Sequence, residues 1–173
     1  MQYFRDVLSA EQSDAFASGI RRGLQERDFG LWAVEVIGIA DFIGFVGLSI
    51  PSFESHFTPC IEIGWRLAAE HWRQGYASEA AAAVLDYAFG PLARDEIVSF
   101  TAIANRPSIA VMERVGMMRN PVDDFDHPNL PDGHPLRPHV LYRLQRARRR
   151  SPTSSRALSQ KRESGGIPKD EEE

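Results

Sequence analysis

The apolar residues of the first thirty positions follow one face of a helix. They form a single helical stripe at Ala15, Phe16, Ile20 and Leu24. Ser9 and Gln12 match a capping box, in which two side chains three positions apart satisfy backbone groups at a helix start. A helix is therefore predicted from residue 9 to residue 27, and Gly30 ends the pattern.

Strand-like patterns follow this helix. Residues 31–37 and 42–50 are rich in β-branched and aromatic side chains, and the short gap between them predicts an antiparallel hairpin. A loop is expected over 51–59 and a third strand over 60–67. This third strand alternates between two faces, with Ile61, Ile63 and Trp65 on one and Glu62, Gly64 and Arg66 on the other.

The second half of the chain alternates helices and strands. Helices are predicted over 78–89 and 107–115, and strands over 97–104 and 140–144. Residues 120–138 are rich in Pro, Asp and His and are expected to form a loop, with a short strand near its start, before the last strand closes the sheet. The element order predicts an α/β (α+β) fold with a mixed sheet and a strand–loop–helix unit at its centre.

Length and composition indicate one globular domain with a tail. The chain has 173 residues, of which 43% are hydrophobic and 25% charged, and such a chain can bury a core. Apolar residues become sparse near the C-terminus, so we expect a folded domain over 1–145 and a disordered, charged tail over 146–173.

Charge is divided unevenly between these two parts. The net charge is −4, yet the tail holds eight Lys or Arg against five acidic residues. The body is therefore acidic, which argues against a nucleic-acid partner and favours a cationic substrate such as an amine, although acidity also serves solubility. The arginine run at 148–150 keeps a contact with RNA or a ribosome open, with a solvated tail as the simpler interpretation.

The cysteine, the histidines and the apolar runs narrow the class of protein further. Cys60 is the single cysteine, so the chain forms no internal disulfide, as is typical of a reducing cytoplasm. No apolar run approaches the ~20 residues that cross a bilayer, and the first residues lack a secretory-signal pattern. The five histidines show no metal-ligand spacing. We expect a cytoplasmic protein with no metal and no membrane partner.

The strand–loop–helix unit carries the candidate chemistry. Gly75 has no Cβ, so its backbone can approach a ligand closely, and Ala77 is nearly as small. The first N–H groups of a helix lack intrahelical partners, and with the helix dipole they attract an anion such as a pyrophosphate. Arg73 adds a positive charge and Ser78 a hydroxyl. An ordinary turn with one glycine is the alternative interpretation of these residues taken alone.

Several short motifs occur together in a fixed order: GFVG at 44–47, EIGWRL at 62–67, HWRQGYASEA at 71–80, NRPS at 105–108 and ERVGM at 113–117. In this combination the chain resembles the GNAT superfamily over residues 1–144, and within it the RimJ/RimL branch of ribosomal-protein-alanine acetyltransferases. The resemblance implies a mostly antiparallel sheet with flanking helices and a central acetyl-CoA site. It implies an N-acetyltransferase that moves the acetyl group of acetyl-CoA, its co-substrate, directly to a primary amine on a protein N-terminus or a small molecule.

The resemblance also implies cofactor contacts. Backbone N–H groups of one segment would bind the pyrophosphate, at Arg73, Gln74, Gly75, Tyr76, Ala77 and Ser78. The end of the third strand would pair its backbone with pantetheine, at Trp65, Arg66 and Leu67, and an N–H near Trp65 would stabilise the oxyanion. Asn105 would contact the cofactor in the gap between two strands. Trp72 stands where most of the family has Arg or Gln, as in the RimL-like branch.

Acetyl transfer to an amine also needs a proton acceptor and a proton donor for the leaving thiolate. Glu62 is the candidate general base, directly or through water, and a solvated or ion-paired carboxylate is the alternative. Many relatives have a tyrosine as donor where this chain has Met112, so Ser108 is the candidate donor. A helix-capping hydroxyl is the alternative for Ser108, and Tyr76 and Tyr142 are weaker candidates for the donor.

The chain departs from the family at its start. Relatives begin with an edge strand and a helix before the region that matches residues 1–4, and this chain is expected to lack both. The strand at 31–37 would then be an exposed edge, which favours association, including a homodimer, and lower stability than a chain extended upstream. These departures keep a non-catalytic or degenerate acyl-CoA-binding module open as the alternative to an enzyme, with an RNA-associated protein third.

Overall fold

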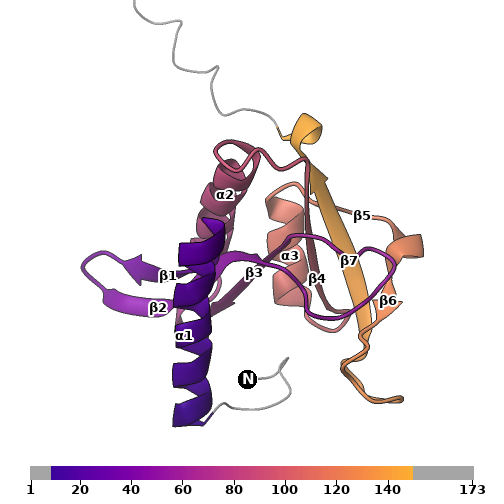
Figure 1. Cartoon of the computed structure of the whole chain (residues 1–173), viewed down its shortest axis with the longest axis horizontal. Coiled ribbons are helices and arrows are strands. Elements are labelled where there is room, and N and C mark those ends of the chain that lie inside the picture. The colour runs from indigo at the N-terminus through magenta and orange to yellow at the C-terminus, as the bar shows by residue number, and fades with distance from the viewer. Residues whose placement is uncertain (1–8, 150–173) are drawn as a thin grey trace, which may run out of the picture.

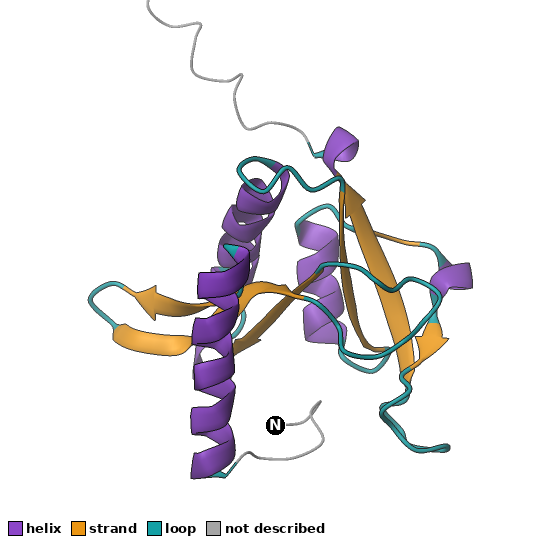
Figure 2. Cartoon of the chain, viewed as in Figure 1, coloured by secondary structure: helices purple, strands orange, loops and turns teal. Residues whose placement is uncertain are grey.

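The computed structural model describes residues 9–149 (Figures 1 and 2). Its helices and strands are, in chain order, α1 (Ala10–Arg27), β1 (Leu31–Val36), β2 (Ala40–Ser49), β3 (Glu62–Leu67), α2 (Tyr76–Phe89), β4 (Glu96–Ala102), α3 (Arg106–Arg114), β5 (Met118–Arg119), β6 (Phe125–Asp126) and β7 (Pro138–Gln145). Short 3-10 turns lie at Ala69–His71, Pro121–Asp123 and Arg146–Arg148. The predicted order of elements is confirmed, with α2 beginning two residues earlier than expected.

The sheet is antiparallel except at one junction. Its strand order is β1-β2-β3-β4-β7-β5, and β6 also pairs with β7. Of the strands that the structure describes, only β3 and β4 run parallel, through the single residue pair Glu62 and Val98. The last strand, β7, does not close the sheet as predicted, because β5 and β6 pair along its outer side.

The two faces of the sheet are covered differently. We call the side covered by α2 and α3 the helix face; it holds most of the core, including Ile63, Leu85, Ile97 and Met112, each at most 1% exposed. We call the opposite side the loop face, because the 50–61 segment packs Phe53 and Phe57 against Val98 and Leu141 there. Phe53 and Phe57 lie in a segment that the sequence predicted only as a loop. The second, smaller hydrophobic cluster therefore combines side chains of a segment without regular structure with side chains of β4 and β7.

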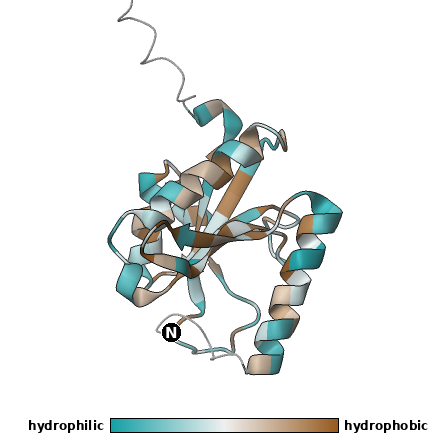
Figure 3. Cartoon of the chain, turned by 90° about the vertical axis from the view of Figure 1, so that its left-hand side faces the viewer, coloured by the Kyte–Doolittle hydropathy of each residue, from teal (hydrophilic) through white to brown (hydrophobic). Residues whose placement is uncertain are grey.

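The first helix stands over the loop face at the β2 side, in front of the sheet in Figure 1. The predicted capping box is present, since the Ser9 hydroxyl accepts from the Gln12 N–H and the Gln12 side chain accepts from the Ser9 N–H. The apolar stripe covers little surface: Phe16 reaches the Phe45 ring at 5.7 Å between centroids but remains 41% exposed. Figure 3 shows polar and pale segments along much of α1, while apolar ribbon gathers in the sheet.

The described chain continues slightly past the predicted domain boundary at residue 145. Arg149 donates to the Asp86 carboxylate and to the Ala82 carbonyl of α2, each at 2.7 Å. Residues 150–173, and with them most of the predicted tail, lie outside the described residues. Between residues 9 and 149, no helix has the length and apolar character that a bilayer crossing requires.

Candidate functional site

The site begins where β3 and β4 separate. The Val98 N–H donates to the Ile61 carbonyl at 3.0 Å, and the parallel ladder includes only the Glu62–Val98 pair. Beyond it, β3 stays paired with β2 on its other side through Leu67. Because the Ile61 carbonyl points to β4, the alternation of a strand also points the backbone N–H and C=O of Trp65 toward β4. A strand edge able to bind an extended ligand thus opens inside the sheet.

The turn after β3 leads directly into α2. The Trp72 indole N–H donates to the Leu67 carbonyl at 2.8 Å and holds the turn against the end of β3. Arg73 and Gly75 both have positive φ, 62° and 93°. A Cβ at Gly75 would have no atom of residues 9–149 within 4 Å, so open space lies in front of the helix start. The tight turn and this open space match an anion-binding helix N-terminus.

Hydrogen bonds at the start of α2 refine the predicted set of amides. The Ser78 N–H already donates to the Gly75 carbonyl at 3.0 Å, which leaves the amides before it for a ligand. The Ser78 hydroxyl accepts from Arg114 at 3.1 Å. Arg114 comes from α3, so a second cation beside Arg73 lies near this helix start. Sequence reasoning missed Arg114, because only the packing of α3 against α2 brings a residue 36 positions away into contact.

Glu62 lies at the point where the strands separate, on the loop face. Its side chain is partly buried, and the Ser49 hydroxyl of β2 donates to Oε2 at 3.2 Å. Burial raises the pKa of Glu62 from 4.5 to about 7, against the smaller opposing effect of the Ser49 hydrogen bond. No charged neighbour among the described residues contributes to this shift of the Glu62 pKa. A carboxyl group with such a pKa can take up a proton near neutral pH.

Asn105 and Ser108 form one hydrogen-bonded unit at the start of α3. Asn105 is 8% exposed; its Oδ1 accepts from the Ser108 N–H at 3.4 Å, and its Nδ2 donates to the Ser108 hydroxyl at 3.0 Å. The cap is therefore the Asn105 side chain, and the Ser108 hydroxyl keeps its own proton available because it acts as acceptor. Met112 is 1% exposed in the core, and the Tyr142 hydroxyl is committed to Glu113 at 3.0 Å.

A cluster of aromatic side chains packs on the loop face of the sheet, the face that carries Glu62. It combines loop residues with residues of β4, β6 and β7: Phe53, Phe57, Phe100, Phe125, His127 and His139. The two imidazoles lie 4.9 Å apart between centroids, and burial lowers the pKa of both. In the described part of the chain, no three His, Cys, Asp or Glu residues are placed to hold a metal ion.

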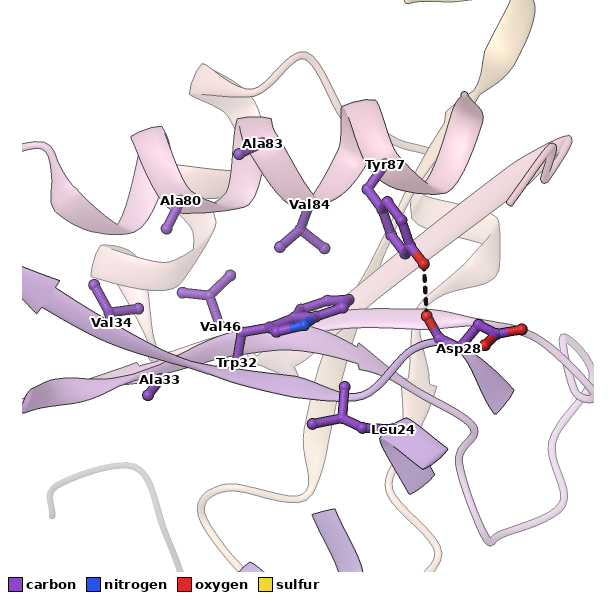
Figure 4. A pocket seen from close by; sticks show the side chains of 10 residues that line it. All are labelled: Leu24, Asp28, Trp32, Ala33, Val34, Val46, Ala80, Ala83, Val84 and Tyr87. Carbon is purple, nitrogen blue, oxygen red and sulfur yellow. Dashed lines mark hydrogen bonds between the residues drawn. The ribbon is translucent and has the colours of Figure 1, made fainter. Parts of the chain in front are cut away.

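A separate apolar pocket of about 610 Å³ lies between α2 and β1 (Figure 4). It is lined mostly by apolar side chains: Leu24, Asp28, Trp32, Ala33, Val34, Val46, Ala80, Ala83, Val84 and Tyr87. The Tyr87 hydroxyl donates to the Asp28 carbonyl at 2.7 Å, and Trp32 meets Tyr87 edge to face at 5.6 Å. None of the predicted site residues lines this pocket, so it is not the place where they converge.

Known proteins resemble this chain in sequence. Residues 1–118 match the Acetyltransferase (GNAT) domain family. The chain is 30% identical over 117 residues to the uncharacterized protein YkkB of Bacillus subtilis, across 68% of this chain and 67% of YkkB. It is 36% identical over 95 residues to the FsC-acetyl coenzyme A-N(2)-transacetylase of Aspergillus fumigatus, across 51% of this chain and 39% of that protein. The chain spans about a third to two thirds of the length of the curated relatives it matches.

Solved structures show the same fold. A GNAT-family acetyltransferase from Bacillus anthracis is 27% identical with a TM-score of 0.65, over 85% of this chain and 81% of that chain. The ribosomal-protein-S5-alanine acetyltransferase from Vibrio fischeri has a TM-score of 0.68 at 14% identity, over 86% and 81%, which is a likeness of fold alone.

Proposed function

This chain belongs to the GNAT acetyltransferase family, as its motifs predicted, and on that premise we propose that it transfers the acetyl group of acetyl-CoA directly to a primary amine. GNAT acetyltransferases use acetyl-CoA as co-substrate. The observation that carries the proposal is Glu62, a carboxyl group with a pKa of about 7 at the opening between β3 and β4. Support for transfer to nitrogen comes from the similarity to the fungal N(2)-transacetylase.

The described residues fit the two ends of the co-substrate. The backbone of Trp65 offers an N–H and a C=O toward the opening, as an extended amide chain such as pantetheine requires. The α2 start offers free amides and open space at Gly75, with Arg73 and Arg114 nearby as counter-charges for a pyrophosphate. Acetyl-CoA, when bound, supplies the activated acetyl thioester.

In this proposal, Glu62 and Ser108 each take one proton transfer of the reaction. Glu62 accepts a proton from the attacking amine, which needs the carboxylate form and so favours pH values above about 7. A backbone N–H near Trp65 stabilises the oxyanion. The Ser108 hydroxyl, held by Asn105, donates toward the leaving sulfur. A direct transfer needs no covalent enzyme intermediate, so no nucleophilic cysteine is required.

A non-catalytic acyl-CoA-binding module is the second candidate function. It is favoured by Met112, which stands where many relatives have a tyrosine donor and is buried in the core at 1% exposure. Such a module would use the same cofactor contacts without Glu62 or Ser108 taking part.

A thiol-release assay with acetyl-CoA and a panel of primary amines, including peptides with free N-termini, separates the two. We expect turnover with at least one amine, and a slower rate for Glu62→Gln with unchanged acetyl-CoA affinity. Glu54→Gln, an exposed carboxylate of the 50–61 segment, is the matched control and should behave as wild type. Acetyl-CoA binding without turnover across the panel would support the non-catalytic module instead.

A further inference from the structure

Three glycines lie near the strand opening, and close backbone packing explains two of them. At Gly44 φ is +137°, and a Cβ would overlap the Arg66 carbonyl. At Gly47 a Cβ would overlap the Gly30 carbonyl. Close backbone packing therefore requires both of these glycines.

Neither a positive φ nor close backbone packing explains the glycine at position 64. It lies in the middle of β3 between Glu62 and Arg66, on the loop face, and its φ is not in the left-handed region. Among the described residues, a Cβ at Gly64 would meet a single atom within 4 Å, the Glu62 Oε1 at 3.7 Å. A glycine inside a strand weakens the strand, and it often marks a site where a ligand approaches the backbone closely. The space over Gly64 is open and bordered by the carboxyl group that accepts the proton.

The open space over Gly64 lies on the loop face of the sheet, from which the acceptor would approach. Gly64 and Glu62 share the loop face, whereas α2, whose start holds the phosphate-binding turn, covers the helix face. The two substrates would thus reach the opening from opposite faces of the sheet. We propose that the acceptor amine lies over Gly64, with its nitrogen beside Glu62, and that the missing side chain at Gly64 sets how bulky the acceptor can be next to that nitrogen. This inference rests on the proposed amine acetyltransferase function.

Steady-state kinetics on the full chain test this with Gly64→Ala, Gly64→Val and Gly19→Ala. Gly19 is the matched control, because a Cβ there likewise meets no tight contact among the described residues, yet it lies on the exposed helix α1. With the best amine of the panel, we expect kcat/KM for the amine to fall about 10-fold or more in Gly64→Ala, and further in Gly64→Val. Acetyl-CoA affinity and melting temperature should not fall in Gly64→Ala, because the new Cβ would make only an ordinary contact with Glu62 Oε1 and no described atom must move.

The possible outcomes separate cleanly. Unchanged amine kcat/KM in a folded Gly64→Ala variant would overturn the inference while wild-type turnover still supports the proposed function. A selective loss of acetyl-CoA affinity would also overturn it, since the space would then serve the cofactor. No wild-type turnover with any amine would refute the proposed function, and this inference with it.

Discussion

The raised pKa of Glu62 has a direct consequence for stability. A pKa that rises from 4.5 to about 7 on folding corresponds to roughly 3 kcal/mol, at about 1.4 kcal/mol for each tenfold change in proton affinity. Below pH 4.5 both states are protonated and Glu62 contributes nothing. Between pH 4.5 and 7 the folded state keeps a proton that the unfolded state releases, so stability falls as pH rises. Above pH 7 Glu62 is ionised in both states, and its burial lowers the free energy of unfolding by the full amount.

Glu62→Gln removes this titration while keeping shape and an oxygen that can accept from Ser49. Compared with wild type, the variant should gain little free energy of unfolding at pH 4.5 and up to roughly 3 kcal/mol at pH 8.5. Urea denaturation of both proteins at the two pH values measures the gain. His127 and His139 titrate in both proteins, so their effect cancels in the difference. An equal gain at both pH values would show that folding does not raise the Glu62 pKa.

Two further predictions concern the cofactor site. Gly75→Glu should abolish acetyl-CoA binding in calorimetry, because it places bulk and negative charge at the start of α2. The control Gly133→Glu has a similar positive φ of 78° and equally open space, so it should carry the same backbone strain and keep binding. Comparable affinities in the two variants would remove the α2 start from the site. Ser108→Ala should lower kcat and leave acetyl-CoA affinity unchanged, because Asn105 still caps α3 through the backbone N–H of residue 108; an unchanged kcat would leave Ser108 as a helix-start hydroxyl.

The local features of the fold could be predicted from the sequence because neighbouring residues determine them. The capping box of Ser9 and Gln12 involves groups three positions apart, and it is present as expected. The alternation of β3 places Glu62 and Trp65 on opposite faces of any strand with these residues, whatever packs against it. The helix start after Gly75 follows from the turn and the apolar pattern of α2 in the same way. These features located the candidate site within a short stretch of chain.

Contacts between distant segments decided the rest. Nothing local shows that β3 and β4 share a single residue pair and then separate, or that Phe53 and Phe57 of a predicted loop pack as core. The burial of Glu62 and the contact of Arg114 with Ser78 likewise depend on elements far apart in the chain. Helix capping and side-chain periodicity act within a few residues, so the sequence determined which groups this protein carries and on which face. Desolvation and strand separation arise only when whole elements pack, so the tertiary structure decided the Glu62 pKa and the open space beside it.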